Sequence, residues 1–521
     1  MLNYLNFTES FAAIANSHFI IASIIIFLFL LYHGARFYLI SLAIIIFASK
    51  YLIGSNWLYL LVPLLIFNLP SIRKYLVSLP ILKLIIKLKF IPKISKSEEI
   101  ALRCGESWID KDLFSGKPDF QKIFANPYNK LSKEEQNFLD NQVEFVCNLA
   151  DDWEIFNNRD LPAKVWNYLK KENFFGMIIP KEYGGREFSA LAHSEVVAKL
   201  ASRSQVLAIT VMVPNSLGPG ELLMHYGTKK QKEHYLPRLA AGKDIPCFGL
   251  TEPSAGSDAT SIAADGEVFK DRTGKLRIKL NFEKRYITLG AVATLIGLAF
   301  KLRDPNNYLG MGENPGITCA LIKNTNKGVT IGRRHDPLNV PFVNSPIIGK
   351  DVIISVDDII GGAKQAGNGW KMLMECLAVG RGISLPATSS GSTKLVTKLI
   401  SSYASVRKQF GLEIAKFEGV SEKIAPIAAY NYMLEAARIF TASAIDNNHK
   451  PSVINAICKY HFTDKFREII NNAMDIQGGA AICRGPRNLL AHIYMGTPIA
   501  ITVEGANILT RSLIHFGQGS I

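Results

Sequence analysis

The run Cys247–Asp258 (CFGLTEPSAGSD) brings together hydroxyl, carboxylate and glycine residues in a pattern that fits neither a helix nor a strand interior. Pro253 disfavours helical conformation in the residue before it, which predicts a turn here. Gly256 and its polar neighbours allow backbone N–H groups to lie along the edge of a flat polar ligand. We therefore predict a loop that can contact a ligand. An ordinary Asx or Ser turn is the alternative.

Glu504 is the candidate for acid–base chemistry. It follows the largely apolar run Ala500–Val503 and directly precedes Gly505, so a bend can aim its carboxylate into a cleft. An apolar pocket raises the pKa of a carboxyl group toward the range of an efficient general base. The alternative is a carboxylate that caps a helix over Ala506–Ile514.

Seven cysteines are scattered through the 521 residues, without a C-x-x-C pair. An odd number without metal-ligand spacing argues against a disulfide framework and against a zinc site, and it fits a reducing compartment. We predict no metal.

The net charge of +15 is unevenly distributed. Residues 1–99 hold 9 Lys/Arg and 3 Asp/Glu, and seven of these basic residues lie in Arg73–Lys96, which has no acidic residue. The other 422 residues hold 50 Lys/Arg and 41 Asp/Glu without a comparable basic run. This distribution argues against nucleic acid as a partner.

Three apolar runs precede that basic tail, over Phe19–Tyr32, Phe37–Ala48 and Trp57–Leu69. Each is shorter than the ~20 residues that span a bilayer, although flanking residues could extend them. We predict membrane insertion, with Arg73–Lys96 facing the cytoplasm and anionic membrane lipid. A buried helical hairpin and an interfacial helix are the alternatives. A cleavable signal peptide fits poorly because the start lacks a basic region.

Changes in pattern divide the chain into four parts. Residues 1–96 form the hydrophobic segment, and residues 97–245 show helical periodicity, with Ser132 and Glu135 in a capping-box pattern. Residues 246–360 contain short β-branched runs at Lys275–Leu280, Arg285–Leu289, Ile317–Ile322 and Val352–Val356. Residues 361–521 return to long amphipathic helices, over Trp370–Gly380, Thr393–Tyr403, Glu422–Ile445 and Val453–Met474. This order predicts an α+β organisation.

Several motifs in order resemble the acyl-CoA dehydrogenase family over roughly residues 100 to 521. They are Ile178–Gly185, Tyr226–Lys232, the 247–258 loop, Tyr286–Thr288, Arg407–Gly411, Gly478–Gly479 and Val503–Gly505. The phrases KRYITL, RHDPLNVPF and AITVEGANILTRS are most similar to the bacterial, membrane-associated fatty-acid-degradation type. Those relatives carry a long carboxy-terminal extension, relative to which this chain is truncated.

Because no side chain accepts a hydride, this chemistry requires an organic cofactor. The resemblance implies that the cofactor is FAD. Leu250, Thr251 and Ser257 of the loop, together with Tyr286, Ile287 and Thr288, would contact the flavin. The dinucleotide half would meet a second set, across a subunit interface of a homo-oligomer: Arg407, Gln409, Phe410, Phe417, Asp475, Gly478, Gly479, Ala506 and Asn507.

The resemblance also implies that Glu504 is the catalytic base and that Ser257, Arg381 and Gly505 contact substrate. Some family members place the base one residue before the arginine that matches Arg381, but Gly380 has no side chain. Asp475 and Ala506 depart from the residues that are usual in the family, which puts their individual contacts in doubt.

The expected activity is therefore conversion of a saturated fatty acyl-CoA to the trans-2-enoyl-CoA, the first step of β-oxidation, at the inner (cytoplasmic) membrane with the catalytic domain in the cytoplasm. Electrons would pass to electron-transfer flavoprotein or another acceptor. An acyl-CoA oxidase and a catalytically silent membrane scaffold are the alternatives.

Overall fold

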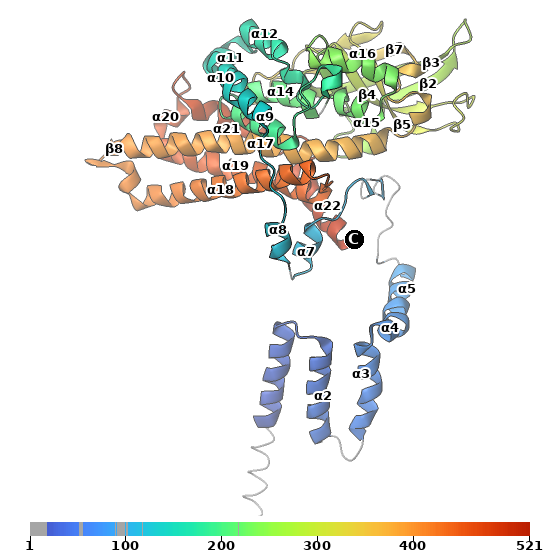
Figure 1. The fold of residues 1–521 in the computed structure, drawn as a ribbon, viewed down its shortest axis with the longest axis vertical. Helices are drawn as coiled ribbons and strands as arrows, with labels where there is room; N and C mark the ends of the chain where they lie inside the picture. Colours follow the sequence, from blue (N-terminus) through green and yellow to red (C-terminus); the bar gives the residue numbers. More distant parts are fainter. Residues whose placement is uncertain are drawn as a thin grey trace, which may run out of the picture. The chain divides into compact units, whose positions relative to one another are not determined.

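The computed structural model describes residues 18–51, 56–88, 90, 99–100, 103–116, 118–216 and 218–520 (Figure 1). It consists of two compact units, Met1–Ile94 and Ser95–Ile521.

Helices make up the described part of the first unit. They are His18–Tyr32, α2 (Phe37–Tyr51), η1 (Asn56–Leu60), α3 (Leu61–Asn68), α4 (Pro70–Arg73), the π-helical turn η2 (Lys74–Ser78) and α5 (Leu79–Lys87). Aromatic contacts join these helices, with the rings of Phe19 and Phe47 stacked at 6.3 Å. Asn68 Nδ2 donates to Ser41 Oγ at 2.7 Å, which satisfies two polar groups on otherwise apolar helices.

By length and composition, the bent pair Leu58–Asn68 and Pro70–Lys87 is long and apolar enough to cross a membrane if taken together, although its two parts meet at 84°. His18–Tyr32 and Phe37–Lys50 are apolar but shorter. A further apolar helix, Gln205–Tyr226, is 94% buried within the second unit. Burial on this scale is typical of a helix in the core of a globular domain.

The second unit begins with short helices: α7 (Asp110–Phe114), α8 (Phe120–Phe124), α9 (Lys133–Phe138), η3 (Leu139–Val143), α10 (Glu144–Leu149), α11 (Asp152–Asn158), α12 (Ala163–Lys171), α13 (Ala190–Ala201), α14 (Gln205–Ser216), α15 (Pro219–Tyr226) and α16 (Lys229–Ala240). The predicted capping box is confirmed: Glu135 N–H donates to Ser132 Oγ, and Ser132 N–H donates to Glu135 Oε2 at 2.7 Å.

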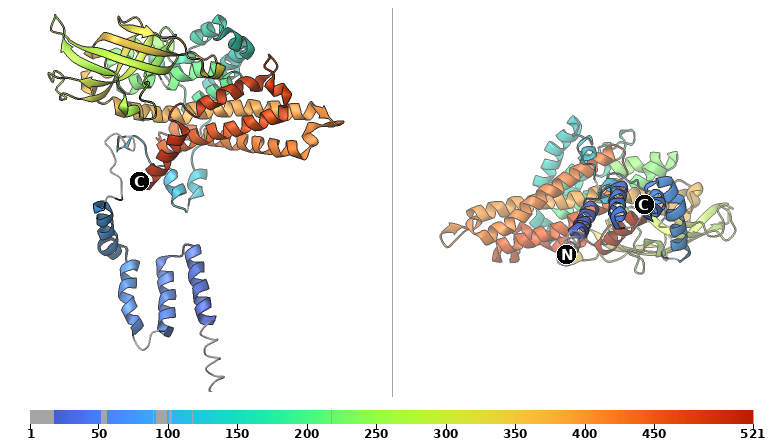
Figure 2. Two further views of the ribbon diagram at one scale, coloured as in Figure 1. Left: turned by 180° about the vertical axis from the view of Figure 1, so that it is seen from behind. Right: turned by 90° about the horizontal axis from the view of Figure 1, so that it is seen from below.

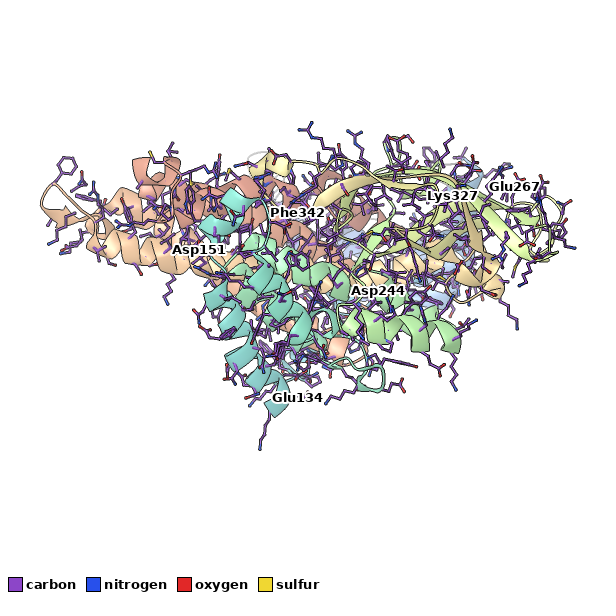
Figure 3. The ribbon with its side chains drawn as sticks, turned by 90° about the horizontal axis from the view of Figure 1, so that it is seen from above. Glu134, Asp151, Asp244, Glu267, Lys327 and Phe342 are labelled. Carbon is purple, nitrogen blue, oxygen red and sulfur yellow. The ribbon has the colours of Figure 1, made fainter. Side chains whose placement is uncertain are left out.

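A seven-stranded sheet follows, made of β1 (Pro246–Gly249), β2 (Asp265–Lys270), β3 (Leu276–Thr288), β4 (Leu295–Arg303), β5 (Gly316–Lys323), β6 (Val329–Ile331) and β7 (Asn344–Ser355). The order is β1-β4-β2-β3-β7-β6, with β5 paired to β4. The two strands predicted at Lys275–Leu280 and Arg285–Leu289 are one strand, β3, whose register against β7 shifts twice. The largest core joins this sheet to the preceding helices and includes Phe342 (Figure 3).

The C-terminal domain is a bundle in which α17 (Gly369–Val406), α18 (Glu418–Asp446) and α19 (Ser452–Gln477) lie side by side (Figure 2). A small hairpin, β8 (Lys408–Gln409) and β9 (Leu412–Glu413), connects α17 to α18, and α20 (Gly479–Ile482), α21 (Leu489–Ala500) and α22 (Asn507–Ser520) complete the domain. The helices predicted at Trp370–Gly380 and Thr393–Tyr403 are parts of the single helix α17. The order of helical, β and helical domains confirms the predicted α+β class.

Candidate active site

Glu504 lies in a tight turn between α21 and α22. Its φ is 54°, and Gly505 follows with a φ of 93°. A left-handed conformation is costly for a residue with a Cβ and persists where the surrounding structure holds it. The turn is held by Asn507 N–H, which donates to Ile501 O at 2.9 Å. The predicted bend at Glu504–Gly505 is therefore present, and it is strained at the residue that we predict to be catalytic.

Both carboxylate oxygens of Glu504 are buried and have no hydrogen-bond partner among the described residues. Arg381 on α17 lies beside this turn, because a Cβ built on Gly505 would lie 3.7 Å from its Nη2. Burial raises the pKa of the Glu504 carboxyl to about 7, although Arg381 and Lys459 act in the opposite direction. A carboxyl group with a pKa near 7 can accept a proton efficiently at neutral pH.

Arg381 itself is half-buried, and its Nε makes no hydrogen bond within the described part of the chain. Burial lowers the pKa of this guanidinium, while Glu504 raises it. The structure thus places two of the predicted substrate contacts, Arg381 and Gly505, directly beside the predicted base. The alternative position for the base is sterically closed as well as lacking a side chain, since a Cβ at Gly380 would lie 2.9 Å from the Ser216 carbonyl oxygen.

A buried ion pair holds the 247–258 loop on the sheet. Lys284 on β3 is fully buried and bonds Glu252 Oε1 at 2.6 Å, while Glu252 also accepts from the N–H groups of Ala263 and Ala264. Lys284 Nζ donates further to Leu250 O at 3.2 Å. With Glu252 anchored inward, Ser257 is exposed and Thr251 is partly exposed. Sequence reasoning placed Thr251 and Ser257 at the ligand but missed the lysine that fixes their loop.

Tyr286 is exposed at the end of β3 although its neighbour Ile287 is buried. Its φ of 59° turns the side chain out of the strand, and Asn344 Nδ2 donates to its carbonyl oxygen at 3.1 Å and to Thr288 Oγ1 at 3.5 Å. The ring of His335 lies 5.0 Å from the Tyr286 ring, and the Arg285 guanidinium lies 4.7 Å from its centroid. His335 belongs to the RHDPLNVPF phrase, but the sequence did not indicate its contact with Tyr286.

The remaining predicted contacts gather at the opposite end of the helical bundle, where β8 joins α17 to α18 (Figure 1). Phe410 is 94% exposed, and its ring meets that of Phe417 at 6.2 Å. Tyr403 OH donates to Gln477 O at 3.4 Å, which brings the Gly478–Gly479 turn to the same end. This distal cluster is exposed apart from the half-buried Phe417, and comprises Arg407, Gln409, Phe410, Phe417, Asp475, Gly478 and Gly479.

The distal cluster is too far from Glu504 to share one ligand within a single chain. Arg381 lies on α17, and Arg407 lies at its C-terminal end. The helical stretch from residue 381 to residue 407 measures about 39 Å at 1.5 Å per residue. The structure therefore brings together Glu504, Arg381 and Gly505, but it does not bring Arg407 to them.

Asn507 makes hydrogen bonds within the protein that the sequence did not predict. Its side-chain oxygen accepts from Lys459 Nζ at 2.8 Å, and its Nδ2 donates to Thr463 Oγ1 at 2.9 Å and Tyr460 O at 3.5 Å. Protein groups thus bind both ends of the amide, and the contact of Asn507 with a cofactor stays a prediction. Ala506, half-buried in the same turn, has only its backbone to offer a ligand.

The groups near the loop and β3 fit a flavin. Gly256 has open space where a Cβ would project, Ser257 is exposed beside it, and Tyr286 presents a half-exposed aromatic ring. The buried, unpaired carboxylate of Glu504 is the group predicted to act as the base toward the substrate of such a cofactor. Among the described residues, no group of three or more His, Cys, Asp or Glu could hold a metal ion.

Two curated relatives match about three quarters of the chain at low identity, and a third matches a short stretch at higher identity. A 3-(aryl)acrylate reductase of Clostridium sporogenes is 27% identical over 396 residues, which are 75% of this chain and 98% of that protein. The mouse mitochondrial very long-chain specific acyl-CoA dehydrogenase is 27% identical over 408 residues, 77% of this chain and 60% of that protein. A 96-residue stretch, 18% of this chain, is 64% identical to Protein HemX of Proteus mirabilis and spans 56% of that protein.

Solved structures show the same fold. Butyryl-CoA dehydrogenase from Megasphaera elsdenii superimposes with a TM-score of 0.66 at 23% identity, over 74% of this chain and 98% of that one. An acyl-CoA dehydrogenase from Geobacillus kaustophilus gives a TM-score of 0.66 at 20% identity, over 75% and 99%.

Family models for all three acyl-CoA dehydrogenase domains match the chain in order: the N-terminal domain over residues 129–243, the middle domain over 247–352 and the C-terminal domain over 367–517. These boundaries follow the helical, β and helical domains described above. The chain belongs to the acyl-CoA dehydrogenase family of FAD-dependent oxidoreductases acting on CH–CH groups.

Proposed function

We propose that this protein oxidises a saturated fatty acyl-CoA to the trans-2-enoyl-CoA, the first step of fatty acid β-oxidation. The observation that carries the proposal is the carboxylate of Glu504, which is buried, unpaired and raised in pKa to about 7 in a strained turn. A structural carboxylate would be paired or solvated, because an unpaired buried charge is costly.

Different residues have different roles in the proposed reaction. Glu504 takes the proton from the carbon next to the thioester, and Arg381 and Lys459 favour its charged form beforehand. Bound FAD supplies the acceptor for the hydride that leaves the neighbouring carbon. The 247–258 loop, fixed by Lys284 and Glu252, and the exposed Tyr286 would hold the flavin, with Thr251, Ser257 and Thr288 as hydrogen-bonding groups.

A fatty acyl chain is the proposed substrate because of the likeness to a very long-chain specific enzyme over 77% of this chain. Other relatives differ in the acid they act on, so chain length is the property to measure. Anaerobic addition of saturated acyl-CoAs of graded length to the purified protein should bleach the flavin absorbance, with one range of lengths preferred. If none of them bleaches the flavin while a saturated 3-arylpropionyl or short dicarboxylic thioester does, the fatty acyl proposal is wrong.

Electron-transfer flavoprotein, or another acceptor protein, is the proposed partner for reoxidation. An acyl-CoA oxidase would instead pass electrons to oxygen. Enoyl-CoA formation in air without a stoichiometric amount of hydrogen peroxide supports the dehydrogenase, and stoichiometric peroxide supports the oxidase.

We further propose that the protein acts as a homo-oligomer. Arg407 and the rest of the distal cluster lie about 39 Å along α17 from Arg381, yet they carry the predicted contacts to the dinucleotide half of FAD. A second copy of the chain would bring that cluster to the flavin held by the first. The exposure of Phe410 and Val406, 94% and 75%, also favours coverage by another surface.

Membrane association at the cytoplasmic side of the inner membrane is the last part of the proposal. The helices of the first unit expose large apolar side chains along most of their length, including Ile25, Phe29 and Leu42. Water does not stabilise such surfaces, whereas the acyl region of a bilayer does. The basic residues Arg73, Lys74, Lys83 and Lys87 on α4, η2 and α5 are positioned in sequence to meet anionic headgroups.

A further inference from the structure

Lys459 is a fully buried lysine on α19 whose ammonium group is directed at the turn that carries Glu504. Its Nζ donates to the Gly505 carbonyl oxygen at 2.7 Å and to Asn507 Oδ1 at 2.8 Å. A lysine without exposure is rare, and it usually has partners that compensate for lost hydration. Here both named partners are neutral oxygens of the Glu504–Asn507 turn.

Neighbouring residues on α19 complete a clamp on that turn. Thr463, one helical turn beyond Lys459, accepts from Asn507 Nδ2 at 2.9 Å and donates to the Lys459 carbonyl oxygen at 2.8 Å. The first residue of α22 is thus fixed from both ends of its side chain. Because Glu504 and Gly505 both have positive φ, the turn depends on such external contacts to keep its conformation.

The charge of Lys459 also acts on Glu504. The cations that influence this carboxylate are Arg381 on α17 and Lys459 on α19. On α22, Arg511 and His515 are exposed. On α21, His492 Nδ1 is hydrogen-bonded to Asp152 Oδ2 at 2.7 Å. Burial lowers the pKa of Lys459 to about 8, with Arg381 acting the same way and Glu504 opposing both. Lys459 therefore carries its charge at neutral pH.

We propose that Lys459 is a positioning residue of the reaction, which holds the Glu504–Gly505 turn in place and keeps the Glu504 carboxylate charged. This inference rests on the proposed role of Glu504 as the base. Lys459 touches neither reacting carbon, so its effect on the rate is transmitted through the carboxylate and the turn.

Removing the charge should shift the pH dependence of flavin reduction. In full-length Lys459→Met with FAD bound, we expect the apparent pKa of the base to rise by about one unit or more, since a nearby cation is lost. The rate of flavin reduction by acyl-CoA should then fall about fivefold or more at pH 7 and recover most of that loss by pH 9. Lys459→Arg should keep the wild-type profile more closely. An equal loss at every pH, or an unchanged profile, would overturn the proposal.

Three controls make this test specific. Lys465→Met removes a lysine on the same helix that pairs with Glu468, and it should leave the profile unchanged. Thr463→Val loosens the clamp without removing charge, so it should lower the rate without moving the apparent pKa. Lys459→Gln retains a hydrogen-bond donor without the charge, and it should show the same shift as Lys459→Met even if the methionine variant folds poorly.

A direct titration separates this inference from the proposed activity. The infrared carboxyl band that disappears in Glu504→Gln reports the protonation of Glu504 without substrate turnover. In Lys459→Gln this band should persist to a higher pH than in the wild type. If no acyl-CoA bleaches the flavin of the wild-type protein but the band still shifts in Lys459→Gln, the proposed activity fails and the inference stands. A band that titrates at the same pH in both proteins overturns the inference alone.

Discussion

At the scale of single residues, Glu504 couples catalysis to stability. Its carboxyl pKa rises from the ordinary 4.5 to about 7 on folding, mainly because of burial. Between these values the folded state binds more protons than the unfolded state. The stability that the neutral carboxyl gives is therefore complete below about pH 4.5 and is lost as the pH rises through about 7.

Glu504→Gln should remove this dependence, because glutamine stays neutral at every pH. We expect the variant to match the wild type near pH 4.5 and to be more stable at pH 8, by on the order of 1–3 kcal/mol. Thermal unfolding of both proteins across this pH range measures the difference. A difference that is the same at pH 5 and pH 8 would show that Glu504 is not buried as described.

The sequence predicted Glu504 because a carboxylate followed at once by glycine lies within a family motif. It could not predict Lys459, which lies 45 residues earlier in a helix and belongs to no motif noted in the sequence. Its contact with Gly505 arises only when α19 packs against α22. His335 lies in the quoted RHDPLNVPF phrase, but its contact with Tyr286 likewise arises only when the segment between β6 and β7 folds against the end of β3. Side chains that act through long-range packing leave no local signal.

At the scale of elements, the Lys284–Glu252 pair connects β3 to the ligand-contacting loop. Lys284→Met would leave the Glu252 carboxylate buried without its cation, which typically costs about 3–5 kcal/mol. We expect a lower melting temperature and a lower ratio of bound FAD to protein in absorbance spectra. Adding Glu252→Gln to this variant should restore part of the stability. If Lys284→Met retains both its stability and its flavin, the ion pair does not support the loop.

The elements that the sequence divided wrongly have a common explanation. Mostly polar residues, 281–284, separate the predicted strands Lys275–Leu280 and Arg285–Leu289. Pairing with β7 through two register shifts makes them one strand. α17 was interrupted in the prediction because glycine and serine fill its middle. Those residues allow close packing: a Cβ at Gly391 would lie 1.9 Å from the Ala198 carbonyl oxygen, and one at Gly382 would lie 2.3 Å from Asn455 Oδ1. Tertiary contacts override local propensity in both cases.

At the scale of the whole molecule, we expect the first unit to hold the protein on the membrane. The full chain should fractionate with membranes and resist a high-salt wash, because apolar burial is not screened by salt. A chain that begins at Ser97 should be soluble and should retain FAD, since the flavin contacts lie beyond that residue. Release of the full chain by salt alone would indicate shallow, electrostatic binding.

The distal cluster should contribute to FAD binding only within an oligomer. Arg407→Ala should lower FAD retention without changing the Glu504 turn, because Arg407 lies at the far end of α17. Arg272→Ala, at an exposed turn between β2 and β3, is the matched control. Mass measurement of the purified protein together with its flavin content tests this. A monomer that binds FAD fully, or an Arg407→Ala variant that retains it fully, would contradict the account.

Flavin reduction by Glu504→Gln is the most direct test of the central claim that this carboxylate is the base. The variant retains the size of the side chain and should still bind FAD and acyl-CoA, but it cannot take the proton. Stopped-flow bleaching of the flavin by a saturated acyl-CoA should slow by about 10²–10⁴-fold or more, while Glu504→Asp keeps partial activity. Bleaching by Glu504→Gln at close to the wild-type rate would show that another group removes the proton.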